Sequence, residues 1–109
     1  MKLVILESPF AANEDRSVED HIAYARKAVR HSLSMGEAPI ASHLLYTQPT
    51  ILNDDIPEER LWGINAGLAW KSVAQAHVFY VDYGWSRGMI YGKEYAKEHN
   101  LEIIERRIL

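Results

Sequence analysis

The pattern of apolar residues along the chain predicts four strands. Leu3–Leu6 and Val78–Val81 are continuous apolar runs without polar alternation, which is typical of strands covered on both faces in a parallel sheet. We therefore expect these two runs to be neighbouring central strands. Ala38–Ala41 predicts a short second strand, and Leu101–Ile104 predicts a further strand at the sheet edge.

Between these runs, apolar residues recur at the three- and four-residue spacing of helices. The three helices are expected at about 17–35, from 53–59 to about 75, and at 89–99. Ser17 can cap the first helix and Gly36 can end it. An aspartate can cap the second, with Pro57 in its first turn, and Asn100 can take a left-handed conformation after the third. Residues 42–49 are too apolar for a solvated loop and too irregular for an element, so we expect them to pack over a cleft.

The alternation of strands and helices is the order of a parallel α/β sheet with right-handed crossovers. It predicts a single domain over residues 1–109, a three-layer sandwich of the flavodoxin or Rossmann kind, with a four-stranded parallel sheet in the order 2-1-3-4. In such sheets, ligands bind beyond the carboxyl ends of the strands, where the strand order reverses. This places residues 7–10, 42–48 and 82–89 around one crevice.

Composition excludes several classes of protein. A chain of 109 residues with 48% hydrophobic and 25% charged residues fits one globular domain. Its formal charge of −3, without clustered Lys and Arg, argues against a nucleic-acid partner. The absence of cysteine excludes disulfides, thiolate metal sites and a cysteine nucleophile. Because no apolar run is long enough for a signal peptide or a membrane span, we expect a cytoplasmic protein without membrane contact.

The loop before the last helix is a candidate for ligand contact. Gly84-Trp85-Ser86-Arg87-Gly88 has the G-x-S-x-G pattern of a hydrolase nucleophile. That interpretation fails because the only later histidine, His99, follows 13 residues after the serine on the same helix, roughly 20 Å away. Ser86–Met89 instead places free N–H groups, a hydroxyl and a cation at a helix N-terminus, which suits a phosphate or a ribose. A tight turn that needs its glycines is an equally good interpretation.

Other candidate ligand contacts lie in the same crevice. His43 could hydrogen-bond a ligand or act as an acid or base, although a packing role suits it equally. Tyr83 and Trp85 beside Arg87 could stack on a base. The remaining candidates are Ser8, Pro9, Phe10, Tyr46, Asp82 and Met89. The other histidines have no metal-type spacing and no acid partner nearby, so we expect surface or core-edge positions for them, no metal and no cofactor: His21, His31, His77 and His99.

Four segments carry a resemblance to known proteins, namely Leu3–Phe10, Ala38–Tyr46, Asp54–Arg60 and Ser86–Met89. Read together, they resemble a family of small bacterial and phage proteins that is similar to nucleoside 2-deoxyribosyltransferases. The resemblance to the small family covers nearly the whole chain. The resemblance to the enzymes rests on the first loop and on the loop that opens the last helix. It implies a flavodoxin-like domain with a nucleoside-binding cleft at the strand ends.

In these enzymes, the motif that opens the last helix contains a glutamate nucleophile, which attacks the anomeric carbon. Laying the Ser-Gly of that motif over Arg87-Gly88 puts Gly92 at the position of the glutamate, so the nucleophile is missing. Glu94 lies two residues further on, a rotation of about 200° on a helix, and should point away from the site.

The resemblance therefore implies binding, without catalysis, of a nucleoside, nucleotide or ADP-ribose-like ligand, as in the sequestration of a nucleotide signal. One alternative is an enzyme that acts on an N-glycosidic bond or a phosphate ester, with Glu7, His43 and Asp82 as acid and base. Another is an assembly protein whose crevice is only a feature of the fold. A homo-oligomer is expected, because the related enzymes complete their sites across subunits. In addition, three Trp and six Tyr are many for so small a core.

Overall fold

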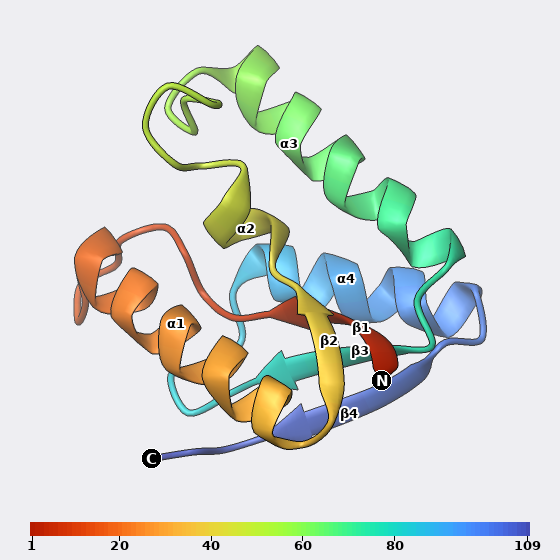
Figure 1. Ribbon diagram of the computed structural model, residues 1–109. Helices are drawn as coiled ribbons and strands as arrows, with labels where there is room; N and C mark the ends of the chain where they lie inside the picture. The colour runs from red at the N-terminus through yellow and green to blue at the C-terminus, as the bar shows by residue number, and fades with distance from the viewer.

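The computed structural model describes residues 1–109 (Figure 1). The strands are β1 (Lys2–Glu7), β2 (Glu37–Ile40), β3 (Ala76–Tyr80) and β4 (Glu102–Arg106). The helices are α1 (Val18–Ser34), α2 (Ser42–Leu45), α3 (Pro57–Ala69) and α4 (Arg87–Glu98), and a 3₁₀ turn, η1 (Trp70–Ser72), follows α3. None of the helices is long and apolar enough to cross a membrane.

All four strands are parallel and lie in the order β2-β1-β3-β4. The pairing of β1 with β2 begins with Lys2 opposite Glu37, and the pairing of β1 with β3 begins with Val4 opposite Ala76. The apolar runs at 3–6 and 78–81 thus lie in neighbouring central strands, as predicted. The predicted α/β sandwich is confirmed, with α1 on one face of the sheet and α4 on the other (Figure 1).

The core has one apolar layer on each face of the sheet. On the α1 side, Leu6 and Val78 pack with Tyr24 of α1. On the α4 side, Phe79 packs with Met89 of α4. Side chains of one strand alternate between these two layers, which explains why the central strands are apolar at nearly every position.

Helix α1 begins and ends where the sequence predicts. The hydroxyl of Ser17 accepts a hydrogen bond from the N–H of Asp20 at 3.1 Å, and the Asp20 carboxylate accepts one from the N–H of Ser17 at 2.9 Å. This reciprocal pair is a capping box. Gly36 after α1 has a φ of +80°, and Asn100 after α4 has a φ of +54°, both in the left-handed region that ends a helix.

Two expectations about the middle of the chain are wrong. Residues 42–45 form the short helix α2 rather than an irregular segment. Helix α3 begins only at Pro57 and ends at Ala69, and its N-cap is Ile56, so no aspartate caps it. A proline favours the first helical position and forces the residue before it into an extended conformation, which fixes the start of α3 at this point.

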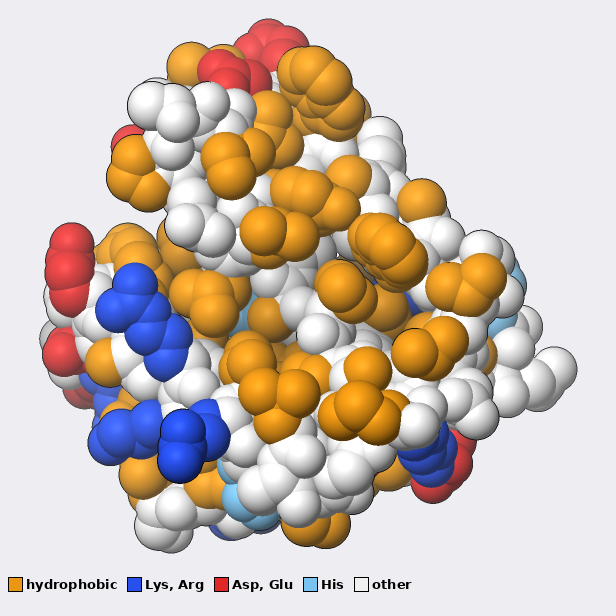
Figure 2. All heavy atoms as spheres, viewed as in Figure 1, with side chains coloured by type: hydrophobic (Ala, Val, Ile, Leu, Met, Phe, Trp, Pro, Cys, Tyr) orange, Lys and Arg blue, Asp and Glu red, His pale blue; other side chains and the backbone are white.

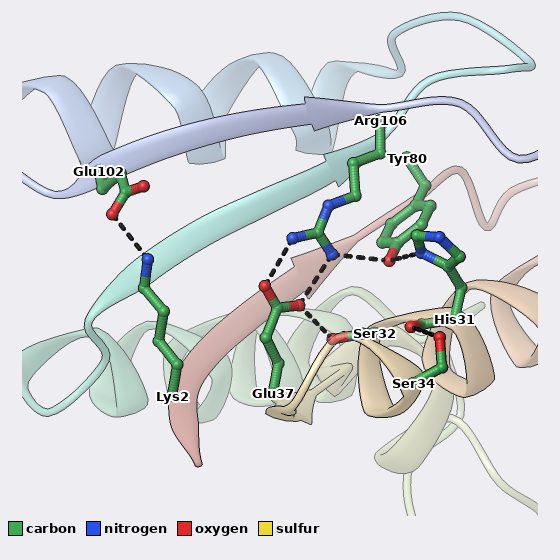
Figure 3. A network of polar contacts seen from close by, with 8 residues as sticks. All are labelled: Lys2, His31, Ser32, Ser34, Glu37, Tyr80, Glu102 and Arg106. Atoms are coloured by element: carbon green, nitrogen blue, oxygen red, sulfur yellow. Dashed lines mark hydrogen bonds and ion pairs between the residues drawn. The ribbon is translucent and has the colours of Figure 1, made fainter.

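A polar network under the sheet joins its two edge strands to α1 (Figure 3). Both guanidinium nitrogens of Arg106 donate to the Glu37 carboxylate, at 2.8 and 2.5 Å, and one also donates to the Tyr80 hydroxyl at 3.0 Å. Ser32 donates to Glu37 at 2.7 Å, and the His31 ring nitrogen lies 2.9 Å from the Tyr80 hydroxyl. The hydrogen bonds from Arg106 hold the pKa of Glu37 below its usual value.

Candidate functional site

Polar groups at the carboxyl end of β1 form a cluster around Glu7. The Glu7 carboxylate pairs with the imidazole of His77 on the neighbouring strand β3. Ile5 stands opposite His77 in the register, so Glu7 and His77 share the face that α4 covers. The His77 side chain is fully buried, whereas 22% of the Glu7 side chain is exposed. The buried imidazole of His77 therefore fixes the position of the Glu7 carboxylate, which is partly open to solvent.

Helix α4 leaves room for this carboxylate at Gly92. A Cβ atom at position 92 would lie 2.7 Å from Glu7 Cδ, well inside van der Waals contact. Close by, Lys71 of η1 is buried, with its ammonium group 4.2 Å from the centre of the Tyr95 ring. Burial lowers the pKa of Lys71, and the negative charge of Glu7 partly offsets that effect.

Ser8 and His43 form a second pair beside this cluster. Ser8 Oγ lies 2.8 Å from His43 Nε2, and this hydrogen bond ties the loop after β1 to α2. Burial of the imidazole lowers the pKa of His43 to about 4, although the charge of Glu7 opposes the shift. His43 is thus neutral near pH 7, where its unprotonated ring nitrogen can accept a hydrogen bond but binds a proton only weakly.

The lowered pKa of His43 predicts a pH-dependent stability. Below pH 6.5 the unfolded histidine binds a proton that the folded protein excludes until about pH 4. We expect the contribution of His43 to be complete above pH 6.5 and to fall as the pH drops from 6.5 to 4, by up to about 1.4 kcal/mol per pH unit. Urea unfolding of the protein and of His43→Gln across this range measures the difference. If the free energy of unfolding changed equally with pH in both proteins, the predicted contribution of His43 would be contradicted.

A cavity of about 670 Å³ lies between the two chain segments that the Ser8–His43 bond joins. One wall is formed by residues 10–12 after β1, and the other by residues 47–55 after α2. The lining contains three acids and no basic residue, and the acids are Asp54, Asp55 and Glu59. The volume falls in the range of small-molecule sites.

Asp82, after the carboxyl end of β3, has intramolecular partners for both oxygens. It accepts hydrogen bonds from the Tyr24 hydroxyl at 2.6 Å and from the backbone N–H groups of Ile108 at 2.9 Å and Leu109 at 3.0 Å. Burial would raise the pKa of Asp82, but these hydrogen bonds outweigh it and the pKa is lowered. The geometry gives Asp82 a structural role, in which it fixes the chain after β4 to the sheet.

Tyr83 and Trp85 are engaged away from the large cavity. The guanidinium of Arg16 lies 3.7 Å from the centre of the Tyr83 ring, beside a smaller cavity of about 300 Å³. The Trp85 ring packs on Phe79, with 4.9 Å between the ring centres. Neither aromatic ring lines the large cavity.

The loop that opens α4 is built as a turn and a helix cap. Gly84 has a φ of +84°, a left-handed conformation that favours glycine. The Ser86 hydroxyl accepts a hydrogen bond from the N–H of Met89 at 3.2 Å and so caps α4. Arg87 and Gly88 are exposed, and Met89 is buried. This loop does not line the large cavity either.

The structure therefore brings together only part of the predicted crevice. Glu7, Ser8 and His43 meet at the end of β1, and Phe10 enters the cavity wall. Pro9 is buried, and the Tyr46 hydroxyl accepts a hydrogen bond from Trp70 at 3.2 Å.

Sequence reasoning missed two members of the site, His77 and Lys71. The expectation that no acid lies near His77, and that His21 and His77 lie at the surface or core edge, is wrong, because both are fully buried and Glu7 is the partner of His77. The predicted pairing of the two central strands gave no signal for this contact, because parallel strands place the start of one beside the start of the other. Only the register, with Ile5 opposite His77, brings Glu7 near the imidazole.

These features define the class of protein as a parallel α/β domain with a polar site at the end of its first strand. Residues 2–106 match the family described as a domain of unknown function, DUF7768, and the chain belongs to that family. No curated protein matches the chain, and no solved structure does.

Proposed function

We propose that the protein binds a nucleoside-like ligand in the large cavity beside the Ser8–His43 pair. The observation that carries this proposal is the cavity of about 670 Å³ between the loop after β1 and the segment after α2. Loops that follow the carboxyl ends of strands are the usual ligand position in this fold. Phe10 supplies an aromatic face for a base, and Thr47 and Gln48 supply hydroxyl and amide groups for the sugar or the base edge.

The charge of the cavity favours an uncharged ligand over a phosphorylated one. Asp54, Asp55 and Glu59 line it without a basic residue. Arg60 lies 3.9 Å from Asp54, but its side chain is largely exposed. A phosphate would repel these carboxylates, at about 1 kcal/mol for each pair of charges 4 Å apart in water. Among nucleosides, nucleotides and ADP-ribose derivatives, the nucleoside thus fits best.

Binding of matched ligands tests this proposal. Adenosine, uridine and thymidine, each with its monophosphate, are titrated by calorimetry. We expect at least one nucleoside to bind and its monophosphate to bind about tenfold more weakly. The double variant Asp54→Asn/Asp55→Asn should reduce the difference in affinity between the nucleoside and its monophosphate. A monophosphate that binds more tightly than its nucleoside would overturn the assignment.

Three substitutions locate the ligand. Phe10→Ala should weaken nucleoside binding about tenfold, because stacking on a base contributes roughly 1 to 3 kcal/mol. Tyr91→Ala removes an exposed aromatic side chain outside the cavity and should change nothing. Arg87→Ala should leave the affinity unchanged, since the loop that opens α4 lies outside the lining. A tenfold loss in Arg87→Ala would place the ligand at that loop instead.

A second function, cleavage or transfer at an N-glycosidic bond, is favoured by the position of Glu7. It requires the nucleoside to bind beside Gly92 rather than in the large cavity, because Glu7 does not line that cavity. Gly92 stands where the enzymes that the sequence resembles have their nucleophilic glutamate. The Glu7 carboxylate reaches the space beside Gly92 from β1, and His77 holds it there. In this proposal, Glu7 attacks the anomeric carbon as the bond to the base breaks, and the base leaves with the electron pair and takes a proton from solvent. Water then releases the sugar from Glu7.

The two functions separate in one pair of variants. If the protein releases free base from a bound nucleoside, Glu7→Gln should abolish that release while affinity stays within about tenfold. Glu94→Gln should change neither, because Glu94 is exposed on α4, as expected from the sequence. Chromatography of the incubated nucleoside detects the free base. Turnover that survives in Glu7→Gln would exclude Glu7 as the nucleophile, and binding without turnover in the unmodified protein would leave the binding function alone.

A further inference from the structure

Helix α3 packs with its small residues inward and its large apolar residues outward. Gly63 lies against Leu52 and Gly67 against Ser42, where added Cβ atoms would come within 3.3 and 2.6 Å of side-chain atoms. These contacts hold α3 to α2 and to the loop after it, and the main packing partners of α3 are α2 and η1 rather than the sheet. A surface helix of a monomer normally turns its apolar side to the core. Here the arrangement is reversed.

The outward apolar residues follow one another along α3 and the turn after it, and we name them the α3 surface. It consists of Leu61, Trp62, Ile64, Trp70 and Val73, which are between 44% and 67% exposed. No charged residue occurs between Arg60 and Lys71. Figure 2 shows hydrophobic side chains gathered along α3 and across the hollow between this helix and the sheet. On the sheet itself, Leu3 of the central strand β1 is 46% exposed.

The size of the α3 surface fits an interface between two copies of the chain. Its side chains present on the order of 500 Å² of apolar area. A stable interface buries roughly 800 Å² on each partner, of which about 65% is apolar in homodimers. The α3 surface therefore supplies nearly all of the apolar area that one subunit needs. A second copy offers the same uncharged surface, so neither partner would bury an unpaired charge.

We propose that a second copy of this chain covers the α3 surface, with the two α3 helices meeting in a symmetric dimer. Parallel sheets are normally covered on both faces, and α3 leaves part of β1 open. The apolar side of the partner's α3 has the chemistry to fill that space. This inference is independent of the ligand, because the large cavity lies in the loops after β1 and α2.

The mass of the protein in solution tests the dimer. Light scattering at micromolar concentration should give twice the chain mass of 12.5 kDa. Trp62→Glu puts a charge at the most exposed residue of the α3 surface and should raise the dissociation constant at least about 100-fold. Ile64→Arg, a second variant on the same surface, should also yield monomers. Far-UV circular dichroism confirms that each variant remains folded.

Leu33→Glu is the matched control, because Leu33 is 50% exposed on α1, away from the α3 surface. It should keep the mass of the unmodified protein. A mass of 12.5 kDa for the unmodified protein across the micromolar range would overturn the dimer. A dimer that survives in folded Trp62→Glu and Ile64→Arg would overturn its placement on α3.

Discussion

Replacement of Arg106 by alanine is expected to lower the free energy of unfolding by about 3 to 5 kcal/mol, because it leaves a buried carboxylate without its partner. Only 6% of the Glu37 side chain and 13% of the Arg106 side chain are exposed. The same guanidinium also bonds Tyr80, so one substitution removes the link between β2, β3 and β4. Urea unfolding at pH 7 measures the loss.

The ion pair between Lys2 and Glu102 is the control for this prediction (Figure 3). It joins strands β1 and β4 at 2.8 Å, but its side chains are 36% and 54% exposed. Lys2→Ala should therefore cost no more than about 1 kcal/mol. Because Arg106 lowers the pKa of Glu37, the stability from that pair is present above pH 4.5 and lost as the pH falls below it. Equal losses in Arg106→Ala and Lys2→Ala would show that burial does not set the strength of the network.

Gly92→Ala should destabilise the protein by about 1 to 3 kcal/mol, even though alanine is the better helix former by about 1 kcal/mol. The new Cβ would take the space of the Glu7 carboxylate and push it away from His77. The buried imidazole would then lose its partner. Thermal and urea unfolding measure the change. The cost should disappear when Glu7→Ala is already present, because the crowding group is then gone.

Gly88→Ala, at the start of the same helix, is the matched control. A Cβ at position 88 would meet nothing closer than the Ser86 hydroxyl at 4.0 Å. This variant should be stabilised by up to about 1 kcal/mol through helix propensity. The two glycine variants are thus expected to differ in sign. A loss of stability in Gly88→Ala as large as that in Gly92→Ala would mean that crowding of Glu7 is not the cause.

The sheet could be predicted from the sequence because its signals are local. The composition of the apolar runs at 3–6 and 78–81 alone indicates strands that are covered on both faces of the sheet. The order of strands and helices along the chain then predicts the topology. The orientation of α3 could not be predicted. Leu61 and Ile64 have the spacing of a core-facing helix, and only the close approach of Gly67 to Ser42 shows that they face outward.

The site was predicted less completely because it depends on register. The candidates Ser8 and His43 do meet, since both follow the carboxyl ends of neighbouring strands. The pairing of Glu7 with His77 depends on a two-residue offset between β1 and β3, which no local pattern reveals. Asp82 accepts hydrogen bonds from the backbone of residues 108 and 109, which are distant in sequence, so no local pattern around Asp82 predicts this role.

The central place of β1 in the sheet has a consequence for the order in which the chain can fold. β1 precedes the other three strands of the sheet along the chain, yet its second partner, β3, begins only at Ala76. Until then, one edge of β1 has unpaired N–H and C=O groups and apolar side chains on both faces, the features that promote aggregation. Emergence of β3 from the ribosome is therefore the step that closes this edge. The contacts that stabilise the sheet join residues far apart in sequence, which favours slow folding compared with helical proteins of the same size.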